Sequence, residues 1–408
     1  MQLVEQHIIE KSDPRWAQLD AVAFASKNLW NAANYLVRQS IIFEQVYLDN
    51  VHVFHLIKQH EAYEGLPRKV SNQVLIQLHK AWKAFFAAMA EWREHPEKFL
   101  SRPKLPTYKH KVQGRNLLVY EKGAISKRAM MRGMISLSGL GDLIPTKQTR
   151  DTIDQVRIVP RSTHYVIEVI YKRTEQQAHL DPTLFASLDL GVNNLAALTS
   201  NAENLPPLLV NGRPLKAWNQ EYNKQRAARQ TQLAKQDCFT SRALDRLTDK
   251  RNRRIKHYLH VASRRIIDLL VEHGISTLII GKNPLWKQEV GMGKRNNQQF
   301  VQIPHARFID MLRYKAELVG ITVIVTEEAY TSRASFLDLD PIPTYDPDRT
   351  EEPTFSGRRV SRGMYRASGK RLINADINGS YNIARKVFPT AFGLGIEAPA
   401  VRPRRLAV

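Results

Sequence analysis

The sequence predicts a multidomain protein of the α+β and α/β classes. It would hold an N-terminal helical bundle with a small β-barrel, then a mixed sheet flanked by helices. Three patterns in the 408 residues support this. Apolar residues recur at three- and four-residue steps over 14–100, which is typical of amphipathic helices. Glycines punctuate short apolar runs over 117–171. From Ala186 onward, short apolar runs alternate with long stretches suited to helices.

Two apolar stripes, over 19–36 and 70–92, predict packed amphipathic helices in the first hundred residues. Prolines end this pattern. The basic segment 102–115, with Tyr108, is interpreted as a loop that contacts a nucleic-acid backbone. Residues 155–159 and 165–171, joined by a proline-containing turn, predict a β-hairpin within a small β-barrel or curled sheet.

The second half of the chain predicts buried strands joined by long helices. The strands are expected at 186–190, 195–198, 277–280 and 322–325. No proline occurs between Pro214 and Pro284, so one or two long helices fit there. Residues 216–256 carry twelve Lys or Arg against four acids, which favours contact with phosphates. Residues 338–369 are rich in Pro, Gly and Asp and predict an extended excursion.

Charge and cysteine content narrow the class of protein. Lys and Arg number 61 against 39 acids, a formal net charge of +22, so a polyanionic partner is expected, nucleic acid before a membrane surface. Cys238 is the only cysteine, which excludes an internal disulfide and a cysteine-built zinc site. No apolar run is long enough to span a membrane, and no secretion signal opens the chain. We expect a cytoplasmic protein, nucleoid-associated if its source is bacterial.

Several common catalytic arrangements are absent from the sequence. There is no phosphate-binding G-x-x-x-x-G-K-[ST] loop and no G-x-S-x-G elbow. His257 and His260 lie on one basic stretch without an evident third zinc ligand. Cys238 has no evident histidine partner for a nucleophilic role.

Carboxylates at three points of the predicted sheet are the stronger candidates. Asp189 lies inside an apolar strand before a glycine turn, an arrangement that RNase H-like folds use for a metal ligand. Glu327 and Glu328 end a late strand, and Asp376 opens the last helix. Asp376 alone would more often be a helix cap. Taken in order, these acids are expected to converge on one edge, where divalent cations offset their repulsion. Mg²⁺ suits such oxygen ligands and two-metal phosphodiester hydrolysis.

Three motifs in order resemble the TnpB (OrfB) family, transposon-encoded RNA-guided DNA endonucleases related to type V CRISPR effectors. S-L-D-L-G-V-N-N-L-A-A-L, which contains Asp189, resembles the first RuvC motif. Y-T-S-R-A-S, from Tyr330, resembles the segment that leads into the family's zinc ribbon. N-A-D-I-N-G-S-Y-N-I-A, which contains Asp376, resembles the third RuvC motif, D-x-N-A-A-x-N-I. S-K-N-L-W-N-A-A-N-Y-L, from Ser26, is similar to the family's N-terminal helix.

The resemblance implies a function, from which the sequence departs at two places. It implies a guide RNA from the flanking transposon end, a DNA target cut beside a short motif, and two Mg²⁺ ions held by Asp189, Glu328 or Glu327, and Asp376. The family's four cysteines after Tyr330 are missing, so no zinc is expected. The family's usual glutamate is replaced near Asn283. We therefore expect Glu327 or Glu328 to supply that carboxylate from a neighbouring strand.

The resemblance and the composition together give a domain assignment. We expect a wedge-like β-barrel domain (1–13 with 101–180), a helical recognition domain (14–100), a RuvC-like nuclease domain (181–330 with 370–388), a cysteine-free insert (331–369) and a basic tail (389–408). Three alternatives remain open: a nuclease-inactive guide-directed repressor, a strand-transfer transposase that uses the same acids, and an RNA-binding protein without catalysis.

Overall fold

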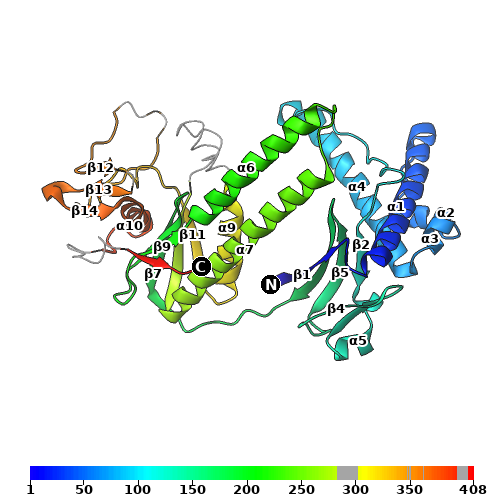
Figure 1. Ribbon diagram of the computed structural model, residues 1–408, viewed down its shortest axis with the longest axis horizontal. Helices are drawn as coiled ribbons and strands as arrows, with labels where there is room; N and C mark the ends of the chain where they lie inside the picture. Colours follow the sequence, from blue (N-terminus) through cyan, green and yellow to red (C-terminus); the bar gives the residue numbers. More distant parts are fainter. Residues whose placement is uncertain (283–301, 347, 349–350, 362, 393–402) are drawn as a thin grey trace. The chain divides into compact units, whose positions relative to one another are not determined.

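The chain folds into two compact units, Met1–Arg173 and Thr174–Val408. The computed structural model describes residues 1–282, 302–346, 348, 351–361, 363–392 and 403–408 (Figure 1). Each unit has its own hydrophobic core. The predicted class, a multidomain mixture of helices with a mixed sheet, is confirmed. In the described part of the chain, no helix is both long enough and apolar enough to cross a lipid bilayer.

Helices of the first unit follow the two apolar stripes. α1 (Trp16–Gln39) and α4 (Arg68–Glu94) pack together, and the short helices α2 (Asn50–Ile57) and α3 (Glu61–Glu64) lie between them in the chain. Trp82 on α4 is buried, and its indole N–H donates to Asn34 Oδ1 on α1 at 3.0 Å. This bond satisfies two polar groups that would otherwise be costly inside a core.

The first unit also holds an open sheet. Its strand order is β1 (Gln2–Glu10), β6 (His164–Lys172), β5 (Ile153–Pro160), β2 (Leu118–Glu121). The predicted hairpin is β5–β6. Helix α5 (Lys127–Met131) precedes a separate ribbon, β3 (Met134–Leu137) with β4 (Gly141–Pro145). Among the described residues no pairing joins β1 to β2, so the expected β-barrel is corrected to an open sheet. Helix α4 packs against β2, one of the two edge strands of this sheet.

The second unit is built on a six-stranded mixed sheet. Its strand order is β11 (Thr322–Thr326), β10 (Ile275–Gly281), β7 (Asp181–Leu190), β8 (Asn194–Ser200), β9 (Leu208–Asn211), β15 (Arg404–Leu406). Strands β7, β8 and β9 are antiparallel neighbours, whereas β10 and β11 continue the sheet in parallel on the other side of β7. This is the arrangement of RNase H-like sheets, and the four predicted strands are confirmed.

Helices cover both faces of this sheet because successive strand residues point to opposite sides. Leu188, Leu198 and Ile280 pack into one core with residues of α7 (Arg242–Glu272) and α9 (His305–Glu317). On the opposite face, Ala197 and Leu209 share a core with α10 (Ala375–Val387). Asp189 belongs to this second face, since it alternates with Leu188.

Two long helices occupy the stretch between Pro214 and Pro284, where one or two were predicted, and they form a hairpin with many basic residues. α6 (Arg213–Ala234) and α7 run side by side (Figure 1). Only Leu215 and Asn219 are buried along α6, so most of this helix is accessible to a partner.

The excursion after β11 has more regular structure than its composition predicts. It contains a three-stranded antiparallel sheet of β12 (Arg358–Ser361), β13 (Met364–Arg366) and β14 (Leu372–Asn374). β14 runs directly into α10. The excursion thereby sets the position from which Asp376 enters the second unit.

Candidate active site

Asp189 lies on β7 with its carboxylate against α10. A Cβ atom added at Gly379 of α10 would lie 2.6 Å from Asp189 Oδ2, so only glycine permits this approach. Burial raises the pKa of Asp189 well above its ordinary value, and the charges of Glu328 and Asp376 raise it further, while Arg359 opposes them. A carboxylate in such a place needs a compensating positive charge.

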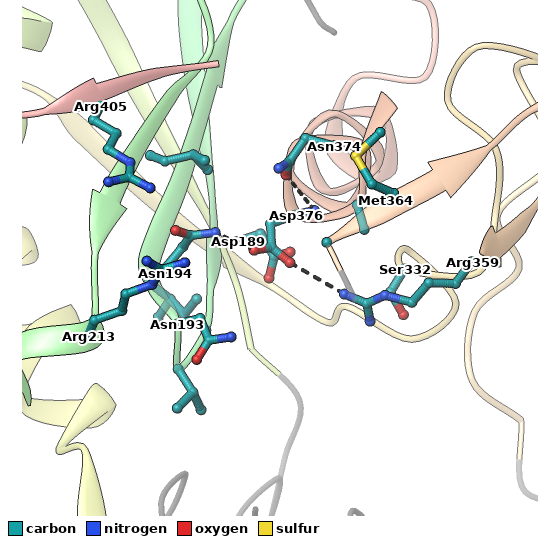
Figure 2. A pocket seen from close by; sticks show the side chains of 16 residues that line it. Asp189, Asn193, Asn194, Arg213, Ser332, Arg359, Met364, Asn374, Asp376 and Arg405 are labelled. Carbon is teal, nitrogen blue, oxygen red and sulfur yellow. Dashed lines mark hydrogen bonds and ion pairs between the residues drawn. The ribbon is translucent and has the colours of Figure 1, made fainter. Parts of the chain in front are cut away.

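Asp376 lies in the first turn of α10 and faces the same space. Asn374 caps the helix, because its Oδ1 accepts from the backbone N–H groups of Asp376 and Ile377 at 3.0 and 3.2 Å. Asp376 is therefore not the N-cap of the helix, the role that its position alone would have favoured. Its carboxylate is left for other partners. Asn194 Nδ2 donates to Asp376 Oδ2 at 2.7 Å, and an Arg359 guanidinium nitrogen lies 3.6 Å from Oδ1 (Figure 2).

The two aspartates line one cavity of about 720 Å³. Figure 2 shows Asp189 and Asp376 between Arg359 on one side and Arg213 with Arg405 on the other. The cavity thus combines acidic groups at its centre with basic groups around them. Its remaining lining residues are Leu190, Gly191, Val192, Asn193, Asn194, Leu209, Ser332, Gly363, Met364, Asn374 and Ala375.

The neighbouring glutamates behave differently. Glu327 forms an ion pair with Lys386 of α10, and its Oε2 accepts from Ala329 N at 3.0 Å. Glu328 turns toward the sheet, where a Cβ added at Gly281 would lie 2.9 Å from its Oε2. Burial raises the pKa of Glu328 to about 7, with Glu327 adding to the rise and Lys386 opposing it. Glu328 is thus the glutamate whose charge acts on Asp189.

The structure brings Asp189, Asp376 and Glu328 near one another, but it does not arrange them as a complete set of metal ligands. Within the ranges that the structure describes, no group of three or more His, Cys, Asp or Glu side chains has the geometry to hold a metal ion. Neither glutamate lines the cavity. Asn283, the predicted departure from the family's glutamate, lies outside the described residues.

A buried hydroxyl network docks α10 onto the sheet. Ser187 Oγ donates to the Ser380 carbonyl at 2.7 Å, and Ser380 Oγ donates back to the Ser187 carbonyl at 3.0 Å. Thr199 Oγ1 lies 2.8 Å from Ser187 Oγ. These bonds fix the register between β7 and α10, two residues from Asp189 and four from Asp376. Sequence reasoning missed Gly379 and Ser380, although both stand where the resembled motif has alanine.

Hydrogen bonds to two aspartates connect separate parts of the cysteine-free excursion. Asp340 accepts from Ser335 N at 2.8 Å and from the backbone N–H and hydroxyl of Ser356 at 3.0 and 2.5 Å. Asp338 accepts from the Ser335 hydroxyl at 2.6 Å and from Ser368 N at 2.9 Å. Each aspartate therefore joins parts of the excursion that are distant in sequence.

The asparagines of the third motif attach α10 to the start of this excursion. Asn378 Nδ2 donates to the Ala334 carbonyl at 2.8 Å, and Asn378 Oδ1 accepts from Phe336 N at 2.9 Å. Asn382 Nδ2 donates to the Thr331 and Ala334 carbonyls at 2.9 and 2.8 Å. Asn378 and Asn382 thereby hold residues 331–336 against α10, the helix that carries Asp376.

We predict that Asp340→Asn destabilises the excursion, because three donors lose a charged acceptor. The expected fall in the free energy of unfolding is about 1–3 kcal/mol, with faster proteolytic cleavage inside 331–374. Asp346→Asn, an exposed change in the same excursion, is the control and should leave both readouts unchanged. A zinc-selective chelator should not shift the melting temperature of the unaltered protein. A marked shift would contradict a metal-free excursion.

Comparison with known proteins places both aspartates in recognised sequence families. Residues 167–286 match the family OrfB_IS605, described as a probable transposase. Residues 305–383 match the Cas12f1-like TNB domain. The first match contains Asp189, and the second contains Glu328 and Asp376. A search of curated proteins found no match.

Solved structures with a similar fold include RNA-guided effectors. A Cas12f1–sgRNA–target DNA complex is 13% identical, with a TM-score of 0.36 over 93% of this chain and 98% of that one. The mini-RNA-guided endonuclease CRISPR-Cas_phi3 is 10% identical, with a TM-score of 0.45 over 97% of this chain and 93% of that one. The two sequence-family matches, which between them hold every carboxylate discussed above, confirm that this chain resembles the TnpB (OrfB) family.

Proposed function

We propose that this chain is an RNA-guided, Mg²⁺-dependent DNA endonuclease, encoded by a transposon, that cuts DNA beside a short flanking motif. The observation that carries the proposal is the shared cavity. Asp189 from the OrfB-matched segment and Asp376 from the TNB-matched segment line one space, surrounded by arginines. Such a combination suits a phosphodiester, whose negative charge needs basic contacts and whose hydrolysis needs acidic ligands for a metal.

The chemistry of these acids suits divalent cations. Asp189 is desolvated and repelled by two other carboxylates, which is the electrostatic deficit that a cation would relieve. Asp189, Asp376 and Glu328 would hold two Mg²⁺ ions, because Mg²⁺ prefers carboxylate oxygen. When bound, such ions activate water and stabilise the leaving oxygen.

The surrounding residues orient these acids. Asn194 and Arg359 hold the two oxygens of Asp376 from different elements, which limits rotation of its side chain. Lys386 engages Glu327 and so leaves Glu328 as the glutamate directed at the site.

The proposed nucleic-acid partners are a guide RNA from the flanking transposon end and the target DNA. Support comes from the charge of the α6–α7 hairpin, because residues 216–256 include twelve basic residues and only four acids. Since α6 is largely exposed, its basic side chains are accessible to phosphates. The duplex of guide and target would be held through its backbone, while base pairing supplies sequence specificity.

Loop 102–115 of the first unit is a second basic surface for RNA or DNA. Lys109 lies over the Trp30 ring at 4.9 Å, and Arg38 over Tyr108 at 4.8 Å. Asn31 Nδ2 donates to the Lys109 carbonyl at 2.9 Å, which anchors the loop on α1. A loop fixed in this way presents its charges without a large ordering cost on binding.

The two glutamates give a prediction that separates their roles. Glu328→Gln should lower the cleavage rate by about 10²–10³-fold, because a metal-ligating charge is lost. Glu327→Gln should instead lower the free energy of unfolding by about 1–3 kcal/mol, because Lys386, only 7% exposed, loses its partner. Cleavage rates and urea unfolding measured on both variants test this assignment. The reverse pattern would make Glu327 the ligand.

One observation favours a second candidate, a nuclease-inactive guide-directed DNA-binding protein. In the described residues the three acids do not form a metal-holding group, and Arg359 already engages Asp376. Such a protein would retain guide and target binding while lacking metal-dependent cleavage.

A cleavage assay distinguishes the two. The protein would be co-expressed with its flanking non-coding RNA, and the purified complex given Mg²⁺ and a plasmid whose guide-matched target adjoins randomised sequence. Cutting next to one enriched short motif, abolished by EDTA and by a mismatched guide, supports the nuclease. Target binding without cutting at any Mg²⁺ concentration supports the binding protein.

A further inference from the structure

A row of residues crosses the sheet from Asp189 to an arginine. Asp189 on β7 pairs with Ala197 on β8, Ala197 pairs with Leu209 on β9, and Leu209 pairs with Arg405 on β15. Residues directly opposite one another in a sheet point to the same face. Arg405 therefore shares the face of Asp189, and its neighbour Arg404 points to the opposite face.

The cavity agrees with this register. Leu209 and Arg405 line it and Arg404 does not, while Leu406 packs with the core on the other side of the sheet. At about 4.8 Å per strand, Arg405 lies three strands or roughly 14 Å from Asp189. A strand in a B-like helical conformation rises roughly 3.4 Å per phosphate along its axis, so this distance corresponds to about four nucleotides of such a strand.

Arg213 also lines the cavity and lies on the same side of the two aspartates as Arg405 (Figure 2). Both side chains are exposed, and within the described ranges neither makes a side-chain hydrogen bond or an ion pair with a carboxylate. Arg359 differs, because it engages Asp376. Two guanidinium groups at one cavity wall, without an acidic partner there, form a site for anions.

We propose that Arg405 and Arg213 bind backbone phosphates of a single DNA strand a few nucleotides from the point of cleavage. Leu209, which lies between Ala197 and Arg405 in this row, lines the cavity and offers the strand an apolar contact beside Arg405. Arginine suits this role since its planar fork matches phosphate oxygens. The inference rests on the proposed nuclease function only where it places the contact near the point of cleavage. The contact with the strand does not itself depend on catalysis.

The test measures strand binding without metal. The full chain in EDTA would be titrated with a fluorescent eight-nucleotide oligothymidylate at several salt concentrations, using Arg405→Gln and the charge-matched control Arg404→Gln. We expect Arg405→Gln to weaken binding about fivefold and to reduce the salt slope by about 0.7, the value of one lost phosphate contact. Arg404→Gln should leave both quantities unchanged, and Arg213→Gln should act like Arg405→Gln.

Two outcomes would overturn the proposal: equal affinity of Arg405→Gln and the unaltered chain, or an equal loss in Arg404→Gln. Melting temperatures of all variants verify folding, and Arg405→Lys should restore the salt slope with part of the affinity. Because the titration uses neither guide nor Mg²⁺, an absence of cleavage in the nuclease assay would not affect it. A failure of the strand site and a failure of the nuclease proposal are thereby separable.

Discussion

Asp189→Ala should lower guided DNA cleavage by about 10³-fold or more, while guide-RNA binding stays unchanged. The carboxylate is at the centre of the cavity, and a metal ligand of this kind accounts for several kcal/mol of transition-state stabilisation. The free energy of unfolding should rise rather than fall, because a desolvated carboxylate repelled by Glu328 and Asp376 is removed. Cleavage rates, RNA affinity and urea unfolding measure the three effects.

The matched control for this variant is Asp181→Asn, a change at the exposed start of the same strand. It removes one negative charge without touching the cavity, so cleavage should stay within about twofold of the unaltered rate. Cleavage by Asp189→Ala at the control's rate would remove this site from consideration.

Gly379→Ala should separate activity from stability at the same site. The new Cβ would lie 2.6 Å from Asp189 Oδ2, so the carboxylate must move. A misplacement of this size can cost about 10²-fold in rate. Alanine in place of glycine inside a helix otherwise contributes about 0.5–1 kcal/mol of stability. We therefore expect slower cleavage and about tenfold weaker Mn²⁺ binding, followed by electron paramagnetic resonance, in a protein that remains folded.

Ser380→Ala is the comparison for Gly379→Ala, because it changes the adjacent residue of α10 and the same motif. It removes the hydroxyl that links α10 to Ser187 and Thr199, at a cost of about 1–2 kcal/mol in the free energy of unfolding. Mn²⁺ affinity should change little. If Ser380→Ala weakened Mn²⁺ binding as much as Gly379→Ala, the close approach at Gly379 would not be the cause.

Local sequence patterns were enough to predict the six-stranded sheet's central strands and two of the acids near it, Asp189 and Asp376. Buried parallel strands give continuous apolar runs, and an acid inside such a run stands out, which is why β7 and Asp189 could be predicted. Asp376 was recognisable from its motif, although Asn374 takes the capping role that Asp376 alone would have been given.

The features that the sequence did not predict depend on contacts between residues that are distant in the chain. The choice between Glu327 and Glu328 depends on Lys386, 59 positions further along the chain. The place of Arg405 depends on the pairing of β15 with β9, and three arginines in a basic tail give no periodic signal for a strand. The three-stranded sheet of the excursion is short and polar, so composition concealed it. The open sheet of the first unit likewise depends on the packing of α4 against β2, which are distant in sequence.

The excursion held by Asp338 and Asp340 also determines which chemical stress acts on it. With no thiol between Tyr330 and Asp376, disulfide exchange has no target there. Acid does have one. Burial acts to raise the pKa of Asp338, but hydrogen bonds from Ser335 and Ser368 and the charge of Arg371 outweigh it, and the net pKa is lowered. The stabilisation from this group is present above its unfolded pKa and lost as pH falls through the folded one. The segment that presents Asp376 is therefore insensitive to thiol reagents and loosens in acid.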